Sequence, residues 1–135
     1  MSRSDTALAE RSYSIGQLCA EFDVTPRTLR FYEAQGLLSP RREGQARRFS
    51  HRDRARLALI LRGKRFGFSL EEIRGLLELY HIGDGGVRQL TETLAAARRH
   101  HAELIAKRDD LNAAIAELEA QIGEAERMLA EKTRR

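Results

Sequence analysis

The sequence predicts an all-α protein with a small β wing: a winged helix-turn-helix followed by a long dimerisation coiled-coil helix. Three observations predict this fold class. Short helices with strong capping residues fill the first 80 residues, an arginine-rich segment with turn formers interrupts them, and a 3.5-residue apolar repeat fills the last third. The chain has 135 residues, about one domain with an extension.

The pattern divides the chain into five segments. Residues 1–11 lack an apolar repeat and form a flexible lead-in, and residues 132–135 form a short tail. Between them we expect a helix-turn-helix module with its wing over residues 12–80, a glycine-rich joint over 81–86 and one helix over 87–131.

The helix-turn-helix is predicted by its caps. A capping box that begins at Ser14 predicts a helix over residues 15–22. Thr25 as N-cap and Pro26 at the first helical position predict a second helix, which Gly36 ends. Two short helices joined by a tight turn, the second beginning with polar and basic residues, are typical of this motif.

The wing and two further helices follow. Residues 39–49 alternate turn formers with two arginine pairs, which predicts a small hairpin. Capping residues at Ser50 and Ser69 predict a third helix over residues 51–66 and a fourth that ends near Tyr80.

The last segment carries apolar residues at alternating steps of four and three. Sustained over more than five heptads, this repeat forms a seam that another helix must cover, so we predict a homodimer. His101 and Arg108 fall on the seam and are expected to fix its register. The candidate dimerisation residues are Leu90, Leu94, Leu104, Leu111, Ile115, Leu118, Ile122 and Leu129.

Charge points to nucleic acid as the partner. Residues 11–66 hold 13 Lys and Arg against 5 Asp and Glu, a net charge of +8, whereas residues 75–135 hold 9 against 11, a net charge of −2. A localised positive surface attracts phosphate polyanions. No membrane span or signal peptide is recognisable, so we expect a cytoplasmic protein with no membrane partner.

The second helix carries the candidate base-reading residues. Thr25, Arg27, Thr28 and Arg30 lie in its first two turns, where hydroxyls and guanidinium forks reach base edges and phosphates. The alternative is that Arg27 and Arg30 are surface residues that pair with neighbours such as Glu33.

The wing and the third helix supply candidate backbone contacts. Arg42, Arg47 and Arg48 suit a clamp on the sugar-phosphate backbone, although a solvated charge run is the alternative. Lys64 suits a phosphate contact, although a cation at the end of a helix also complements the helix dipole.

Four motifs resemble the N-terminal domain of MerR-family transcription regulators. They are Y-S-I-G-Q-L, V-T-P-R-T-L-R-F-Y-E-A-Q-G-L-L-S-P-R-R, R-R-F-S-H-R-D and G-F-S-L-E-E-I, in the family order over about residues 13–80. Within the family, R-L-A-L-I-L-R-G-K-R-F-G-F-S-L-E-E-I is most similar to regulators of branched-chain amino-acid and acyl-CoA breakdown.

The resemblance implies an antiparallel dimer that binds a palindromic operator in promoter DNA, distorts the DNA between the two promoter elements and works with RNA polymerase. Where the family often has two tyrosines, this chain has Phe31 and Tyr32, so phosphate anchoring would rest on Tyr32, which could equally be a core residue. The implied DNA-binding residues are Ser14, Thr25, Arg27, Thr28, Arg30, Tyr32, Arg42, Arg47, Arg48, Phe49 and Lys64.

No familiar sensor is recognisable in the sequence. Metal- and redox-responsive members of the family use cysteines near the dimerisation helix, but the one cysteine here is Cys19, which we interpret as a buried apolar residue. We expect no metal and no cofactor. A small-molecule effector, if there is one, is expected near the joint at 81–86, but the sequence gives no chemistry for it.

The sequence argues against an enzyme and leaves two other functions as alternatives. An enzyme is excluded because no nucleophile and base set, phosphate loop or metal-ligand spacing is present. An architectural or excisionase-like protein that bends DNA without an effector, and more weakly a coiled-coil adaptor, remain as alternatives. The sequence does not determine the operator, the effector, the target genes or the choice between activation and repression.

Overall fold

A computed structural model describes residues 11–82 and 86–134. The predicted flexible lead-in and the centre of the predicted joint therefore lie outside the described residues. The chain divides into two compact units, residues 1–96 and 97–135, and each is described by itself.

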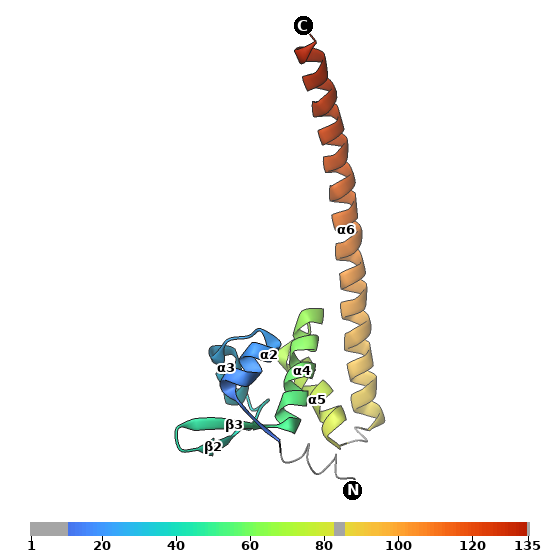
Figure 1. Cartoon of the computed structure of the whole chain (residues 1–135). Helices are drawn as coiled ribbons and strands as arrows, with labels where there is room; N and C mark the ends of the chain where they lie inside the picture. The colour runs from blue at the N-terminus through green and yellow to red at the C-terminus, as the bar shows by residue number, and fades with distance from the viewer. Residues whose placement is uncertain (1–10, 83–85, 135) are drawn as a thin grey trace. The chain divides into compact units, whose positions relative to one another are not determined.

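The first unit holds the helices and strands of the winged module (Figure 1). Its elements in chain order are β1 (Ser12–Ser14), α2 (Ile15–Phe22), α3 (Pro26–Ala34), β2 (Arg41–Glu43), β3 (Ala46–Ser50), α4 (His51–Phe66) and α5 (Leu70–Ile82). The predicted fold class, mainly helical with a small β wing, is confirmed.

The capping residues fix where the helices begin. The Ser14 hydroxyl accepts a hydrogen bond from the Gln17 N–H at 3.1 Å, and Ser50 with Asp53 forms the same box at the start of α4. Ser69 accepts from the Glu72 N–H at 3.2 Å just before α5. Since each box satisfies backbone donors that no helical carbonyl can reach, these starts follow from local sequence.

The wing is the antiparallel hairpin β2–β3, and β1 adds a third strand in the order β1-β3-β2. Tyr13 of β1 lies opposite Phe49 of β3, and Arg42 of β2 lies opposite Arg47. The hairpin was predicted from sequence, whereas β1 was not. This third strand joins the wing to the start of α2.

One apolar core holds the module together. Its fully buried members come from α2, α3, β3, α4, α5 and the segment after α3: Leu18, Leu29, Tyr32, Leu37, Leu38, Phe49, Leu57, Ile60, Ile73 and Leu77. At Gly63 of α4 an added Cβ would lie 3.0 Å from Ile73 Cγ1, so the small residue allows α4 and α5 to approach closely.

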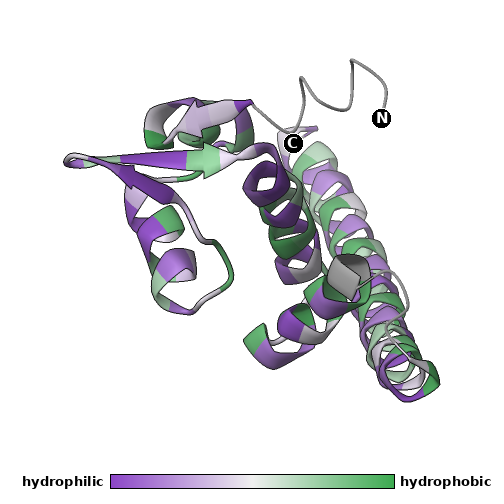
Figure 2. Ribbon diagram, turned by 90° about the horizontal axis from the view of Figure 1, so that it is seen from below, coloured by the Kyte–Doolittle hydropathy of each residue, from purple (hydrophilic) through white to green (hydrophobic). Residues whose placement is uncertain are grey.

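The last element is the single helix α6 (Val87–Thr133), which begins where the sequence placed it and continues two residues beyond the expected end at 131. Its 47 residues correspond to about 70 Å at about 1.5 Å per residue. Hydrophobic and hydrophilic stretches alternate along it (Figure 2). Among the described residues, no helix is long and apolar enough to span a membrane.

Candidate DNA-binding surface

The start of α3 presents hydroxyls and arginines to solvent. The Thr25 Oγ1 atom accepts from the Thr28 N–H at 3.2 Å and lies 3.0 Å from the Thr28 hydroxyl. Arg27 and Arg30 are exposed, whereas Leu29 on the opposite side is fully buried. The helix is therefore fixed by its underside and offers its outer face to a partner, as a recognition helix requires.

Glu33 ties the wing to this helix. The Arg47 Nε atom donates to Glu33 Oε2 at 2.6 Å, and Arg42 Nη2 lies 3.7 Å from Glu33 Oε1. The Arg47 and Glu33 side chains are only 20% and 23% exposed. Glu33 therefore pairs with wing arginines, and neither Arg27 nor Arg30 has an ion pair to it among the described residues.

The other wing arginines have different partners. Arg48 Nη2 donates to the Ser12 hydroxyl of β1 at 2.8 Å. The Arg42 side chain is 54% exposed, and Arg41 pairs with Glu43 of the same strand, β2, at 3.0 Å. In the wing, Arg47 and Arg48 are therefore held within the module, whereas the Arg41 and Arg42 side chains stay mainly exposed.

Two of the proposed DNA contacts are corrected by burial. Phe49 is fully buried between the wing and α4, so it anchors the wing from inside and cannot meet DNA. Tyr32 is 2% exposed, and its hydroxyl is buried with no hydrogen-bond partner among the described residues. Phe31, 47% exposed, occupies the outward position instead. Tyr32 is therefore a core residue rather than a phosphate anchor in this structure.

Ser14 and Lys64 lie at helix ends. The Ser14 hydroxyl is used for the cap of α2, with its remaining lone pair free for a further donor. Lys64 is exposed in the last turn of α4. Both positions are compatible with a backbone contact but do not require one.

Several ion pairs and hydrogen bonds that support the module were not predicted. Arg54 Nε and Nη2 both donate to the Glu21 carboxylate, with a closest distance of 2.7 Å, and this contact lowers the pKa of Glu21. Arg56 Nε donates to the Leu37 carbonyl at 2.9 Å, and burial lowers the pKa of Arg56. No spacing rule could have found these pairs, because their partners are 19 to 33 residues apart.

The buried carboxylate of Asp53 joins the wing to α4. Its Oδ1 atom accepts from the Ser39 N–H at 3.1 Å, and its Oδ2 atom accepts from the Ser50 N–H at 3.3 Å. The capping box predicted the second bond, but the first depends on how the chain returns before the wing. Asp53 thereby holds both ends of the hairpin against the helix.

Cys19 is half-buried on α2. Burial raises the pKa of its thiol, and the charge of Arg30 offsets part of this effect. A higher pKa leaves less of the reactive thiolate. The side chain packs against the core, although it is not the fully buried residue that the sequence predicts. No cluster of three or more potential ligands for a metal ion is present in the part of the chain that the structure describes.

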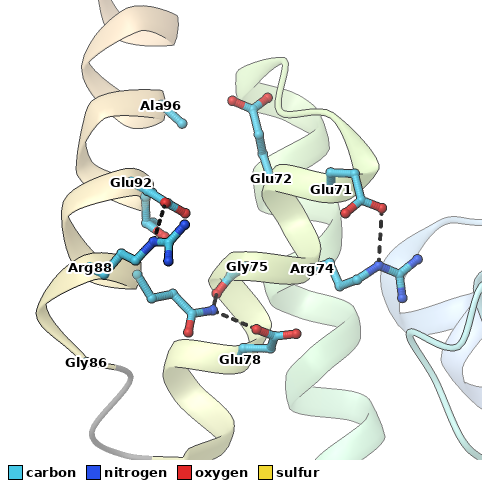
Figure 3. Close-up of a pocket in the computed structure, with 11 residues that line it drawn as sticks. Glu71, Glu72, Arg74, Gly75, Glu78, Gly86, Arg88, Glu92 and Ala96 are labelled. Atoms are coloured by element: carbon cyan, nitrogen blue, oxygen red, sulfur yellow. Dashed lines mark hydrogen bonds and ion pairs between the residues drawn. The ribbon is translucent and has the colours of Figure 1, made fainter.

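A polar hollow lies between α5 and the first turns of α6, close to the joint where an effector was expected (Figure 3). Gln89 Nε2 donates to the Gly75 carbonyl at 3.0 Å and to Glu78 Oε2 at 2.8 Å across it. Arg88 pairs with Glu92 on the rim. Six of its eleven lining residues are charged, whereas small-molecule pockets are usually lined mainly by apolar side chains.

Comparisons with known proteins agree on one family. A model described as MerR HTH family regulatory protein matches residues 13–79, and one described as MerR, DNA binding matches residues 54–121. The HTH-type transcriptional regulator CueR of Salmonella typhi is 33% identical over 105 residues, which cover 73% of this chain and 75% of CueR.

Two further proteins define how far the similarity extends. ZntR of Escherichia coli strain K12 is 42% identical over 69 residues, so the chain spans about half of its length, 49%. The crystal structure of HiNmlR, a MerR family regulator lacking the sensor domain and bound to promoter DNA, has a TM-score of 0.59 and 27% identity. That match covers 73% of this chain and 76% of HiNmlR.

Proposed function

Since this chain belongs to the MerR family of helix-turn-helix regulatory proteins, we propose that it is a transcriptional regulator that binds promoter DNA as a homodimer. In this proposal each α3 enters a major groove of a palindromic operator and each wing rests on the flanking backbone. The pair then distorts the intervening base pairs, and transcription by RNA polymerase in the cytoplasm depends on that distortion.

The observation that carries the proposal is the outer face of α3. Two exposed arginines and a hydroxyl pair stand on a helix whose underside is packed into the core. Glu33 and Arg47 hold the wing beside this helix, so both parts meet DNA as one surface. HiNmlR, which is similar in structure, is bound to promoter DNA.

Footprinting on the region upstream of the protein's own gene tests the proposal. At moderate salt we expect one protected palindrome and much weaker binding to an unrelated duplex of equal length. Protection should weaken steeply as salt rises, since phosphate contacts release counterions. Equal affinity for both duplexes would favour the architectural alternative, in which DNA is bent without a signal.

For an effector we propose acyl-CoA thioesters as the first class to test. The support is the similarity of residues 56–73 to regulators of branched-chain amino-acid and acyl-CoA breakdown. An effector that prefers one conformation must shift either operator affinity or the DNA distortion. Footprints recorded with and without acyl-CoA thioesters would reveal this shift, and free coenzyme A is the matched control.

A further inference from the structure

The helix α6 leaves its apolar seam uncovered. The eight large seam residues predicted from sequence are 41% to 64% exposed. Their helix meets α5 through a different face, on which Gln89 donates to Gly75 and Glu78 and on which Ala96 is buried (Figure 3). The seam is therefore free for a helix from elsewhere.

Within the antiparallel homodimer that the family resemblance implies, we propose that the two copies of this seam pair in one particular register. In this register Leu90 faces the partner's Leu129 and Arg98 lies across from the partner's Glu119. The inference rests on the proposed homodimer and adds which residues face one another within it.

Spacing selects the register. In a heptad seam the steps alternate between four and three, and when two helices run in opposite directions the two kinds of seam position face each other. With Leu90 against the partner's Leu129, every seam position from 90 to 129 meets another seam position. A shift of seven residues either way leaves Leu90 or Leu129 without an apolar layer, because its counterpart falls beyond α6.

The side chains also fit in this register. Small residues face large ones and each polar residue faces a leucine, which keeps the layers similar in volume. A parallel, in-register pair would instead place Arg108 against the partner's Arg108. The layers are Leu90 with the partner's Leu129, Leu94 with the partner's Ala125, Ala97 with the partner's Ile122, His101 with the partner's Leu118, Leu104 with the partner's Ile115, and Arg108 with the partner's Leu111.

Charge agrees with the same arrangement. Residues 98–108 hold four Lys and Arg against one Glu, whereas residues 109–126 hold six Asp and Glu and no Lys or Arg. An antiparallel pair centred between these blocks places basic against acidic, but a parallel pair places like against like. Beside the seam, Arg98 and Glu119 have no ion pair among the described residues, so both are available to a second copy.

Cysteine crosslinking tests the register directly. In a Cys19→Ala background, Leu90→Cys and Leu129→Cys are made as separate proteins, mixed and mildly oxidised. A disulfide needs Cα atoms about 4.4 to 6.8 Å apart, so we expect covalent dimers in the mixture and none from either protein alone. Leu90→Cys mixed with Ile122→Cys is the matched control, since one heptad displaces the thiols by about 10 Å.

The outcomes separate the register from the homodimer. Crosslinking of Leu90→Cys with itself, or with Ile122→Cys, would overturn the register. Absence of the expected crosslink in variants that sediment as dimers would also overturn it and leave the homodimer standing. A wild-type protein that sediments as a monomer would overturn both.

Charge reversal gives a second measurement that leaves the seam intact. We expect Arg98→Glu or Glu119→Arg alone to raise the dimer dissociation constant about tenfold, since two attractive pairs per dimer become repulsive. The double variant should return to within about twofold of the wild type. Glu117→Arg, which makes the same charge change on the outer face, should not rescue Arg98→Glu. Failure of the rescue at Glu119 would refute the pair.

Discussion

At the scale of the residue, the chain separates side chains that hold α3 from side chains that face outward. Leu29 and Tyr32 are buried beneath the helix, and Arg27 and Arg30 are exposed on it. An arginine placed near the start of a recognition helix can donate two hydrogen bonds to guanine O6 and N7. Position on the helix therefore distinguishes readers of bases from residues that fix the helix.

We expect Arg27→Ala to weaken operator binding by about 1 to 3 kcal/mol and to relax base preference at one position of each half-site. The exposed guanidinium makes no ion pair to Glu33, so its removal leaves the fold intact. Competition binding with operator variants measures the effect. Lys107→Ala, an equal charge change on α6, should leave base preference as it is. An unchanged preference in the Arg27 variant would remove this residue from direct readout.

Tyr32→Phe should keep or raise the free energy of unfolding, by up to about 1 kcal/mol, because the buried hydroxyl loses no hydrogen bond. Its ring remains to fill the core. Chemical denaturation measures the change, and operator titration provides the second readout. A clear fall in operator affinity with an unchanged fold would restore Tyr32 as a phosphate anchor.

The residues of the candidate DNA-binding surface differ in how well the sequence alone predicts their exposure. The recognition-helix residues follow from capping and helical spacing, so their exposure was predictable from local pattern. Tyr32 and Phe49 could not be placed in this way, because a ring next to arginines suits either DNA or the core until the strands and helices are packed together. The partner of Glu33 was missed for the same reason, since Arg47 lies 14 residues away.

At the scale of the element, the wing is held to α3 through Glu33 and to α4 through Phe49 and Asp53. The helices were predictable because their caps are local. Strand β1 was not, since Ser12–Ser14 is too short for an alternating pattern and exists through its pairing with β3. Local sequence pattern therefore does not predict pairing between segments that are distant in the chain.

Releasing the wing from α3 should lower the preference for the operator and raise the affinity for any duplex. In Glu33→Gln we expect Arg42 and Arg47 to be released, so affinity for any duplex rises and its salt dependence steepens, whereas the preference for the operator falls. The half-buried pair should also cost about 1 kcal/mol of stability when broken. Binding at several salt concentrations to the operator and to an unrelated duplex measures both effects.

Glu43→Gln is the matched control for the wing. It makes the same change on the hairpin, but Glu43 is exposed, and its one ion pair among the described residues is with the still more exposed Arg41. We expect the operator preference of this variant to match the wild type. Equal behaviour of the two variants would mean that charge alone, and not attachment of the wing to α3, sets the preference.

At the scale of the whole molecule, the two halves of the sequence carry different kinds of information. The basic net charge lies in residues 11–66, which form most of the winged module, and the periodic seam lies in α6. A palindromic operator needs two modules at a fixed spacing. Operator recognition in the proposed function therefore depends on α6, although none of the proposed DNA contacts lies on this helix.

Polar substitution at the centre of the seam should uncouple the two half-sites. We expect Leu111→Gln with Leu118→Gln to raise the dimer dissociation constant by about 10,000-fold or more, because four buried leucine side chains per dimer lose about 1.5 kcal/mol or more each. The resulting monomers should retain the winged fold, whose core contains neither residue. They should bind a half-site weakly and lose the gain from a second half-site.

Sedimentation and operator titration together check this expectation. Ala113→Gln with Ala120→Gln introduces the same two amides on the outer face of α6, and this variant should remain a dimer with full operator affinity. If the leucine variant still sediments as a dimer, the seam is not the interface. If it is monomeric but binds the full operator as tightly as the wild type, recognition does not need two linked modules. In that case there would be no physical reason to expect a palindromic operator.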